Sequence, residues 1–400
     1  MVGTVAAGVL AYVALALSAR ALGPADFGLL GALLGLNTLA GVLMRPAAFG
    51  ATHLTMAATS RDGPVAAGGL LGASVLAGII LLAASLLVLV PGAAPIAGLL
   101  QASGPAPVAM LAPLFGAGLA FQLVSGVLTG LHRFTLLAAA SVLDAGVRAL
   151  CTAPLVLILG VPGSMSAYVV GQLVATAFCV RLAGGLRRPL QRPSELAQGL
   201  STGLSALSLT GGIALMQSGD LVFLRWYGIP EGAGLYAACT SLGTILVSLA
   251  GPLFVPAFPR ALAAFRRNQT TLPILVGVVV PVTVGGAAAI IGARWFGEAI
   301  MRSFFGEAFS AASGILPIYL AKTTVLLLIG VVGQHAIATG RGSLTHLVVP
   351  PAIAGLGLLA LVRADPEGTA ALMLLVVGSV LAILVVATLI ARPARQQAPA

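Results

Sequence analysis

Five charged side chains lie inside long apolar stretches of this sequence, where a charge is costly and usually serves a purpose. They are Arg45, Asp144, Arg148, Asp220 and Lys322. Each needs an opposite charge, a water-filled cavity or a charged ligand, because an isolated charge is unstable in apolar surroundings. The chemistry available is electrostatic. The basic side chains can bind an anion, and the carboxylates can balance their charge.

The spacing of Asp144 and Arg148 predicts that these two charges form a pair. Asp144 and Arg148 are four residues apart with the acid first, so on a helix they face each other. They form either a self-neutralised pair that stabilises packing or part of a binding site. Lys322 is the only lysine in the chain and has no acid within one helical turn. Its partner must therefore come from another helix, from water or from an anionic ligand.

The other candidates have a structural and a functional interpretation side by side. Asp220 comes five residues before Arg225, which it can neutralise. Arg45 lies toward one end of its apolar stretch, so it either reaches the lipid headgroups or lines a cavity. Gln122 and Gln217 are predicted to line the same cavity, although such amides also hold helices together. The predicted substrate-binding set is thus Arg45, Arg148, Lys322, Gln122 and Gln217, with Asp144 and Asp220 for charge balance or ion coupling.

The elements that must position these residues follow from composition. The chain has 400 residues, of which 59% are hydrophobic and only 8% are charged. Soluble domains have about 25% charged residues, so the fold class is an all-α polytopic membrane protein. The alternating polarity of a transmembrane barrel is absent. The net charge of +10 does not indicate nucleic-acid binding, because the arginines flank hydrophobic stretches.

Twelve stretches are long enough to cross a bilayer, which takes about 20 helical residues. They are residues 2–19, 27–50, 66–90, 107–130, 134–159, 163–183, 199–224, 232–256, 271–293, 312–338, 343–362 and 368–391. The first is interpreted as a retained helix, because it lacks a basic leading region. The connections at 131–133 and 160–162 are so short that the helices they join must be antiparallel neighbours.

The basic residues are distributed unevenly over the connections. The even-numbered connections and the tail hold twelve arginines and two acids, whereas the odd-numbered connections hold five arginines and six acids. Cytoplasmic loops are enriched in arginine and lysine. Both termini are therefore predicted to be cytoplasmic, in a multi-pass protein of the inner (cytoplasmic) membrane. A miscounted helix would scramble this division.

A proline- and arginine-rich segment divides the chain into two halves. We expect an N-terminal six-helix bundle at 1–183, a cytoplasmic linker at 184–198 and a C-terminal six-helix bundle at 199–400. An even number of spans in each half makes the repeat parallel. The turn RALGPADFGLL at Arg20–Leu30 returns in altered form as RWYGIPEGAGLY at Arg225–Tyr236. In both, an arginine closes an apolar stretch, glycine and proline make the turn, and an acid opens the next stretch.

Several kinds of chemistry lack their motifs. The four histidines form no HExxH or other metal-ligand spacing, the three cysteines fall inside apolar stretches, and there is no GxxxxGK[ST] phosphate loop. We therefore expect no metal, no cofactor and no catalytic residue, and we predict that the protein is not an enzyme.

The motifs resemble those of a known family. The hairpin R-x-LGPxDFG-L at Arg20–Leu30, its counterpart within Asp220–Ala238 and the Gly251–Arg260 segment resemble the polysaccharide-transporter branch, with its O-antigen-type flippases, of the multidrug/oligosaccharidyl-lipid/polysaccharide (MOP) exporter superfamily. The resemblance implies two six-helix bundles in a V around a central cavity. It also implies a flippase that moves a polyprenyl-pyrophosphate-linked oligosaccharide from the cytoplasmic to the outer leaflet by alternating access. Arg45, Arg148 and Lys322 would then attract the pyrophosphate.

Three alternatives stay open at this point. The first is an ion-coupled exporter of drugs or metabolites on the same fold, for which an acidic cavity is expected. The second is a membrane enzyme that transfers or ligates glycans, and the third is a scaffold for other polysaccharide-assembly proteins. The three basic against two acidic residues inside the apolar stretches favour an anionic cargo.

Overall fold

A computed structural model describes residues 2–62, 67–183 and 194–391, and these residues form helices joined by short connections, with no β-strand among them. The predicted all-α class is therefore confirmed. The linker expected at 184–198 falls largely outside the described residues. The chain separates into two compact units, which we describe individually: unit 1 comprises Met1–Leu204 and Arg225–Ala237, and unit 2 comprises Ser205–Leu224 and Ala238–Ala400.

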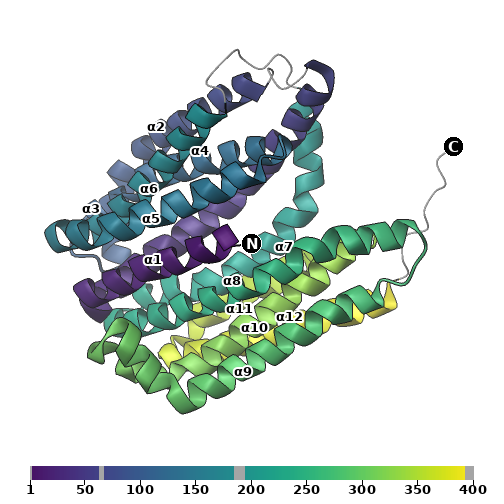
Figure 1. Cartoon of the computed structure of the whole chain (residues 1–400). Helices are drawn as coiled ribbons and strands as arrows, with labels where there is room; N and C mark the ends of the chain where they lie inside the picture. Colours follow the sequence, from purple (N-terminus) through teal and green to yellow (C-terminus); the bar gives the residue numbers. More distant parts are fainter. Residues whose placement is uncertain (1, 63–66, 184–193, 392–400) are drawn as a thin grey trace. The chain divides into compact units, whose positions relative to one another are not determined.

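Unit 1 contains the first six helices labelled in Figure 1. They are α1 (Val2–Asp62), α2 (Ala67–Leu99), α3 (Ala106–Ala109), α4 (Leu111–Gly130), α5 (Phe134–Leu159) and α6 (Val161–Leu182). Helix α5 packs on α6 and on α1, and α4 packs on α2 and α1. The shared core contains Leu71 of α2, Val124 and Val127 of α4, Ala140 of α5 and Ala175 of α6. The turn at Gly160 that joins α5 to α6 confirms the short connection expected at 160–162.

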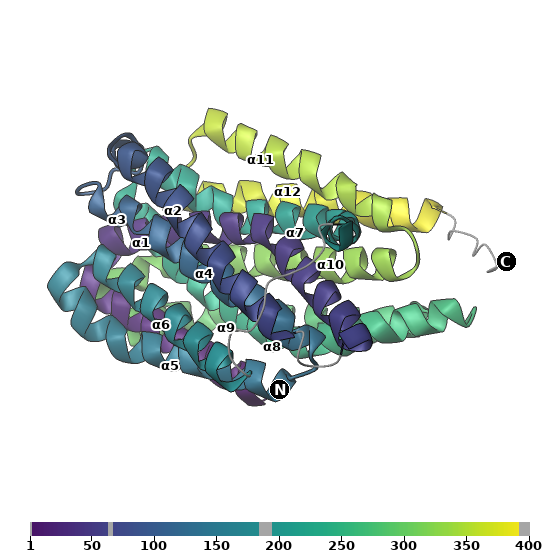
Figure 2. The same cartoon turned by 90° about the horizontal axis from the view of Figure 1, so that it is seen from above.

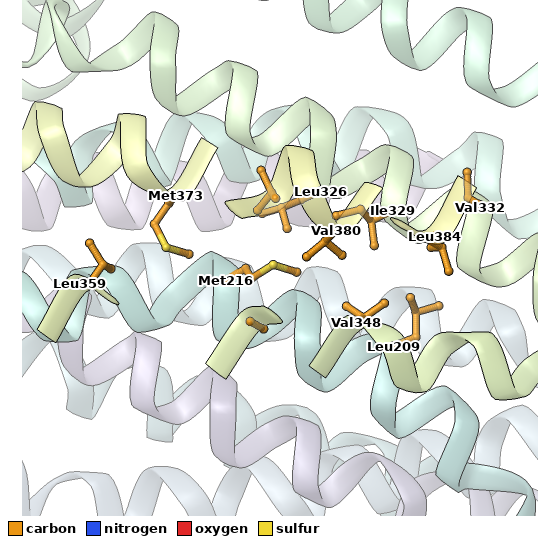
Figure 3. Close-up of a cluster of buried hydrophobic side chains, with 12 residues drawn as sticks. Leu209, Met216, Leu326, Ile329, Val332, Val348, Leu359, Met373, Val380 and Leu384 are labelled. Carbon is orange, nitrogen blue, oxygen red and sulfur yellow. The ribbon is translucent and has the colours of Figure 1, made fainter. Parts of the chain in front are cut away.

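Unit 2 contains the greater part of α7 (Ser194–Trp226) and α8 (Pro230–Arg266), followed by α9 (Leu272–Phe305), η2 (Glu307–Ser313), α10 (Ile315–Ala338), η3 (Gly342–Val348), α11 (Val349–Val362) and α12 (Pro366–Ile390). Helix α10 lies between α9 and α12 in contact with both, and Figure 2 shows α12 alongside α10 and α11 from a second direction. Figure 3 shows the core where α7, α10, α11 and α12 meet, with Met216, Leu326, Leu359, Met373 and Val380 among its side chains.

The ends of the helices follow local sequence rules. Helix α12 begins at Pro366, whose fixed φ suits a first helical turn, and the Asp365 carboxylate accepts a hydrogen bond of 3.0 Å from the backbone N–H of Gly368. Inside α1 the backbone departs from helical geometry at Gly23, where φ is 71° and ψ is 175°. Only glycine adopts this conformation without strain. The break divides α1 into the two helices expected at 2–19 and 27–50.

Eleven stretches of the described chain are helices long and apolar enough to span a membrane. One of them, Ala6–Val42, contains 37 residues and runs across the break at Gly23. A single crossing takes about 20 residues. The chain therefore crosses the membrane eleven times if Ala6–Val42 is one crossing, and twelve times if it is two crossings joined at Gly23. Twelve crossings stay a prediction.

Large apolar side chains cover the outside of both units. Leu150 and Leu157 of α5 and Leu361 of α11 have exposed fractions of 79%, 78% and 82%. A soluble protein does not expose so much apolar surface, whereas lipid chains are the natural surroundings for it. The chain is a multi-pass membrane protein.

Candidate functional site

The centre of unit 2 holds a buried ion pair between α7 and α10. Lys322 Nζ lies 2.6 Å from Asp220 Oδ2, and both side chains have an exposed fraction of 0%. The other carboxylate oxygen, Oδ1, accepts a hydrogen bond of 2.9 Å from the backbone N–H of Leu221. The partner of Lys322 that the sequence left open is therefore a carboxylate from another helix. Asp220 does not pair with Arg225, as its position in the sequence had allowed.

An aromatic ring completes the surroundings of this ammonium group. Lys322 Nζ lies 4.1 Å from the centroid of the Tyr319 ring, a distance typical of a cation–π contact. Tyr319 is buried and precedes Lys322 by three residues on α10, so both side chains lie on one face. The side chain of Thr240 in α8 hydrogen-bonds with Tyr319. The ammonium group thus contacts a carboxylate of α7 and an aromatic ring of α10, and a side chain of α8 hydrogen-bonds with that ring's residue.

Unit 1 contains the ion pair that the spacing of Asp144 and Arg148 predicts. Arg148 donates a hydrogen bond of 2.7 Å from Nη2 to Asp144 Oδ2, and the side chains of Arg148 and Asp144 are 15% and 13% exposed. The guanidinium group also stacks over Tyr168 of α6, with Cζ 4.4 Å from the ring centroid. The pair is therefore braced by a neighbouring helix, but it is less enclosed than the pair in unit 2.

This first pair keeps unused capacity for hydrogen bonds. Among the described residues, Asp144 Oδ1, Arg148 Nε and Gln172 Oε1 are buried without a hydrogen-bond partner. Buried polar atoms are usually satisfied by protein or by ordered water. The cluster of Asp144, Arg148 and Tyr168 can therefore accept a water molecule, an ion or a polar group of a ligand, and the amide of Gln172, near Gly118 of α4, has a separate unused acceptor.

The remaining candidates make no hydrogen bond or ion pair with either of these pairs in the described parts of the chain. Gln122 in α4 is half-buried and faces α1 at Gly41. Gln217 is half-buried on α7, one turn before Asp220. Arg45 is exposed on α1 and makes no ion pair with any residue that the structure describes.

Arg225, at the end of α7, has a role that the sequence did not reveal. Its side chain is 2% exposed and donates three hydrogen bonds to backbone carbonyl oxygens. Nε reaches Leu100 O at 2.9 Å, Nη1 reaches Ala25 O at 2.9 Å and Nη2 reaches Gln101 O at 2.7 Å. The planar guanidinium suits several acceptors at once. One side chain of the second hairpin therefore binds both the first hairpin and the end of α2.

The two repeated hairpins also touch directly within unit 1. A Cβ atom on Gly28 would lie 2.6 Å from the backbone nitrogen of Gly234, and a Cβ on Gly234 would overlap the carbonyl oxygen of Pro24. Real side chains do not fit at such distances, so both positions need glycine for the close approach of the two backbones. The similar motifs at Arg20–Leu30 and Arg225–Tyr236 thus meet each other around equivalent glycines.

Sequence reasoning missed two aromatic residues and one bridging arginine. Tyr319 could have been found, because it lies one turn before Lys322 and shares its face. Tyr168 and the carbonyl partners of Arg225 carry no signal in the sequence, because they come from other helices. No group of three or more His, Cys, Asp or Glu residues lies together as metal ligands in the described parts of the chain.

Comparison with known proteins adds to this geometry. A model of a family described as "Polysaccharide biosynthesis protein" matches residues 1–265, which include both hairpins and both acidic partners, Asp144 and Asp220. The chain belongs to the polysaccharide biosynthesis protein family. A search of curated proteins gave no match.

Solved structures with a similar fold are membrane transporters. An inward-facing multidrug resistance transporter of the MATE family in the MOP superfamily is 16% identical, with a TM-score of 0.76 over 96% of this chain and 93% of its own. The lipid II flippase MurJ, in an inward closed conformation, is 12% identical, with a TM-score of 0.72 over 97% of this chain and 86% of its own. At these identities the similarity establishes the fold, which this chain shares with the two transporters, as the resemblance implied.

Proposed function

We propose that this member of the polysaccharide biosynthesis protein family is a flippase. It moves a polyprenyl-pyrophosphate-linked oligosaccharide, or a related glycolipid, from the cytoplasmic to the outer leaflet for cell-surface polysaccharide synthesis. The single observation that carries the proposal is the family match over residues 1–265, on a chain with a transporter fold. The similarity to MurJ agrees with it, since that protein's cargo is also a lipid.

The charged side chains suit such a cargo. A pyrophosphate is anionic and is best bound by guanidinium groups, which donate several hydrogen bonds in one plane. Arg45 is exposed on α1, and Arg148, whose side chain is 15% exposed, keeps a buried Nε donor without a hydrogen-bond partner. We assign the pyrophosphate to these two arginines of unit 1, with Gln122 of the same unit contacting another polar group of the cargo. Lys322 lies in unit 2, where it is enclosed with Asp220, so we do not assign the pyrophosphate to it.

Cells provide the direct test. Deleting the gene should make a lipid-linked oligosaccharide accumulate on the cytoplasmic face, and the wild-type gene should restore surface polysaccharide. Arg45→Gln should lower export roughly tenfold or more, because a lost charge-assisted hydrogen bond costs about 1.5–3 kcal/mol. Arg294→Gln, at an exposed arginine of α9 outside the proposed set, is the matched control. Unchanged lipid intermediates after deletion would overturn the proposal.

The Asp144–Arg148 pair needs a variant that separates binding from folding. Replacing only one partner leaves a buried charge and destabilises the protein. The double variant Asp144→Asn with Arg148→Gln removes both charges, keeps the shape of the first side chain and leaves a shorter polar side chain at the second position. If the pair binds cargo, the folded double variant loses export. If export continues at the wild-type level, the pair serves packing alone.

The proposed orientation can be tested independently of the cargo. From the distribution of arginines we predict that the protein lies in the cytoplasmic membrane with both termini in the cytoplasm. A tag at the C-terminus should be inaccessible to a membrane-impermeant reagent in intact cells and should react after lysis. Labelling in intact cells would contradict this orientation.

A second candidate function is export of a small molecule. The similarity to a multidrug resistance transporter, with a TM-score of 0.76, favours it. The same deletion strain distinguishes the two. Greater sensitivity to cationic drugs without a change in lipid-linked intermediates would support the exporter, and accumulation of intermediates without a change in drug sensitivity supports the flippase.

A further inference from the structure

A groove between α8, α9 and α10 lies near the end of unit 2 where the chain turns from α8 to α9. Its walls include Phe254 and Phe258 of α8, Leu275 and Val278 of α9 and Val331 of α10. At one end Gln334 and His335 add polar groups, and His335 Nε2 lies 3.4 Å from Thr271 Oγ1 at the start of α9. The groove is therefore apolar along most of its length and polar next to the α8–α9 connection.

The charges around the polar end are all basic. Arg260, Arg266 and Arg267 accompany and follow the lining residues of α8, and all three are exposed. No aspartate or glutamate occurs between Glu231 and Glu298, a stretch that covers α8 after its first turn and most of α9. At about 100° per residue, Arg260 and Arg267 lie to one side of the groove-lining face of α8 and Arg266 lies to the other. Long arginine side chains extend along apolar surface toward the headgroups, so they can contact an anion at this end from both sides.

An apolar groove with arginines at its rim matches a lipid with an anionic headgroup. Basic pockets between transmembrane helices on the cytoplasmic side bind such headgroups, and the cytoplasmic leaflet is rich in anionic lipids. The distribution of arginines along the chain predicts that this end of unit 2 is cytoplasmic. A soluble anion would gain nothing from the two phenylalanine rings, and an uncharged lipid would gain nothing from the arginines.

We propose that this groove binds one anionic phospholipid of the cytoplasmic leaflet as a resident lipid. One acyl chain lies in the groove against Phe254 and Phe258, and the phosphate binds the guanidinium groups of Arg260, Arg266 and Arg267. All these residues belong to unit 2, so the site does not depend on how the two units are arranged. The pyrophosphate of the cargo is assigned to unit 1, and the resident lipid is therefore a separate ligand, whichever cargo the protein moves.

A tryptophan in the groove wall provides the test. Trp226 and Trp295 are the only tryptophans of the chain, so Trp226→Phe and Trp295→Phe combined with Phe258→Trp leave one reporter. The side chain of Phe258 is 36% exposed, which leaves room for the larger ring. In phosphatidylcholine vesicles, dibrominated phosphatidylglycerol should quench this reporter saturably, and dibrominated phosphatidylcholine should quench it only in proportion to its share of the lipid. The preference for phosphatidylglycerol should be at least about fivefold, the contribution of one arginine near the headgroups.

Variants of the reporter protein separate the headgroup from the chain. Arg266→Gln with Arg267→Gln should lower the preference about fivefold or more, and Arg294→Gln, at an exposed arginine of α9 far from the groove in sequence, should leave it unchanged. Ala257→Phe, which fills the groove, should remove the preference although every arginine is present. Equal quenching by the two brominated lipids would overturn the proposal. A preference that survives the loss of both arginines, or the filling of the groove, would overturn it as well.

A second measurement covers the case in which the reporter protein does not fold. Phosphatidylglycerol in mixed micelles should raise the Tm of the wild type more than phosphatidylcholine does. Arg266→Gln with Arg267→Gln should reduce this difference, and Arg294→Gln should keep it. Equal effects of the two lipids on the wild type would contradict the proposal.

Discussion

Replacing Arg225 by alanine should destabilise unit 1 far more than replacing an exposed arginine by alanine. The side chain makes three hydrogen bonds, of which the one to Leu100 O is buried and those to Ala25 O and Gln101 O are partly buried. A buried carbonyl oxygen left without a donor costs about 1–3 kcal/mol, and a partly hydrated one loses about 0.5–1.5 kcal/mol. The free energy of unfolding should therefore fall by roughly 2–6 kcal/mol.

A second substitution at the same position tests the geometry. Arg225→Lys keeps the positive charge, but a single ammonium group cannot reach three carbonyl oxygens from separate segments. We expect its loss of stability to lie between those of the wild type and Arg225→Ala. Arg20, the equivalent residue of the first hairpin, is exposed. Arg20→Ala should change the free energy of unfolding by no more than about 1 kcal/mol.

The assay is reversible unfolding in mixed detergent micelles, followed by circular dichroism and by tryptophan fluorescence. Trp226 follows Arg225 directly, and Trp295 on α9 is the only other tryptophan, so Trp295→Phe makes the fluorescence local to the hairpin. The reasoning is refuted if Arg225→Ala is no less stable than Arg20→Ala. It is also refuted if Arg225→Lys is as stable as the wild type, because charge alone would then account for the role of Arg225.

Two further substitutions test close contacts inside unit 1. Gly234→Ala should lower the free energy of unfolding by about 1–3 kcal/mol, because the added Cβ overlaps the backbone of the first hairpin. The control is Gly251→Ala in unit 2, where an added Cβ meets no atom within 4 Å, so stability should be unchanged or slightly higher. Equal effects of the two substitutions in the same unfolding assay would contradict the contact. Tyr168→Leu should lower the free energy of unfolding by about 0.5–2 kcal/mol, because it removes the ring over Arg148. Tyr168→Phe keeps the ring and should lower it by less. If Tyr168→Phe were the less stable variant, the hydroxyl group and not the ring would stabilise the protein.

The helices of this protein could be predicted because the membrane imposes a simple rule. Every crossing needs about 20 apolar residues, and connections as short as the turn at Gly160 leave little choice of partner. The Asp144–Arg148 pair was equally accessible, since four residues make just over one helical turn. Local spacing was sufficient in both cases.

Contacts between segments distant in the sequence could not be predicted from local spacing. Lys322 and Asp220 are 102 residues apart, and nothing in either apolar stretch indicates that α7 and α10 face each other at that level. The same is true of Arg225, whose partners are backbone atoms and therefore leave no trace in residue type. The repeat of the two hairpins was visible in the sequence, but their mutual packing at Gly28 and Gly234 requires coordinates.

The central claim is that this protein moves an anionic lipid-linked saccharide across a membrane, and reconstitution measures this most directly. Purified protein is placed in vesicles that contain a fluorescent polyprenyl-pyrophosphate saccharide, and the label in the outer leaflet is quenched from outside. We predict that wild-type protein exposes the label of the inner leaflet to the quencher, that Arg45→Gln does so more slowly and that Arg294→Gln matches the wild type. If the wild type is no faster than protein-free vesicles, the account is contradicted.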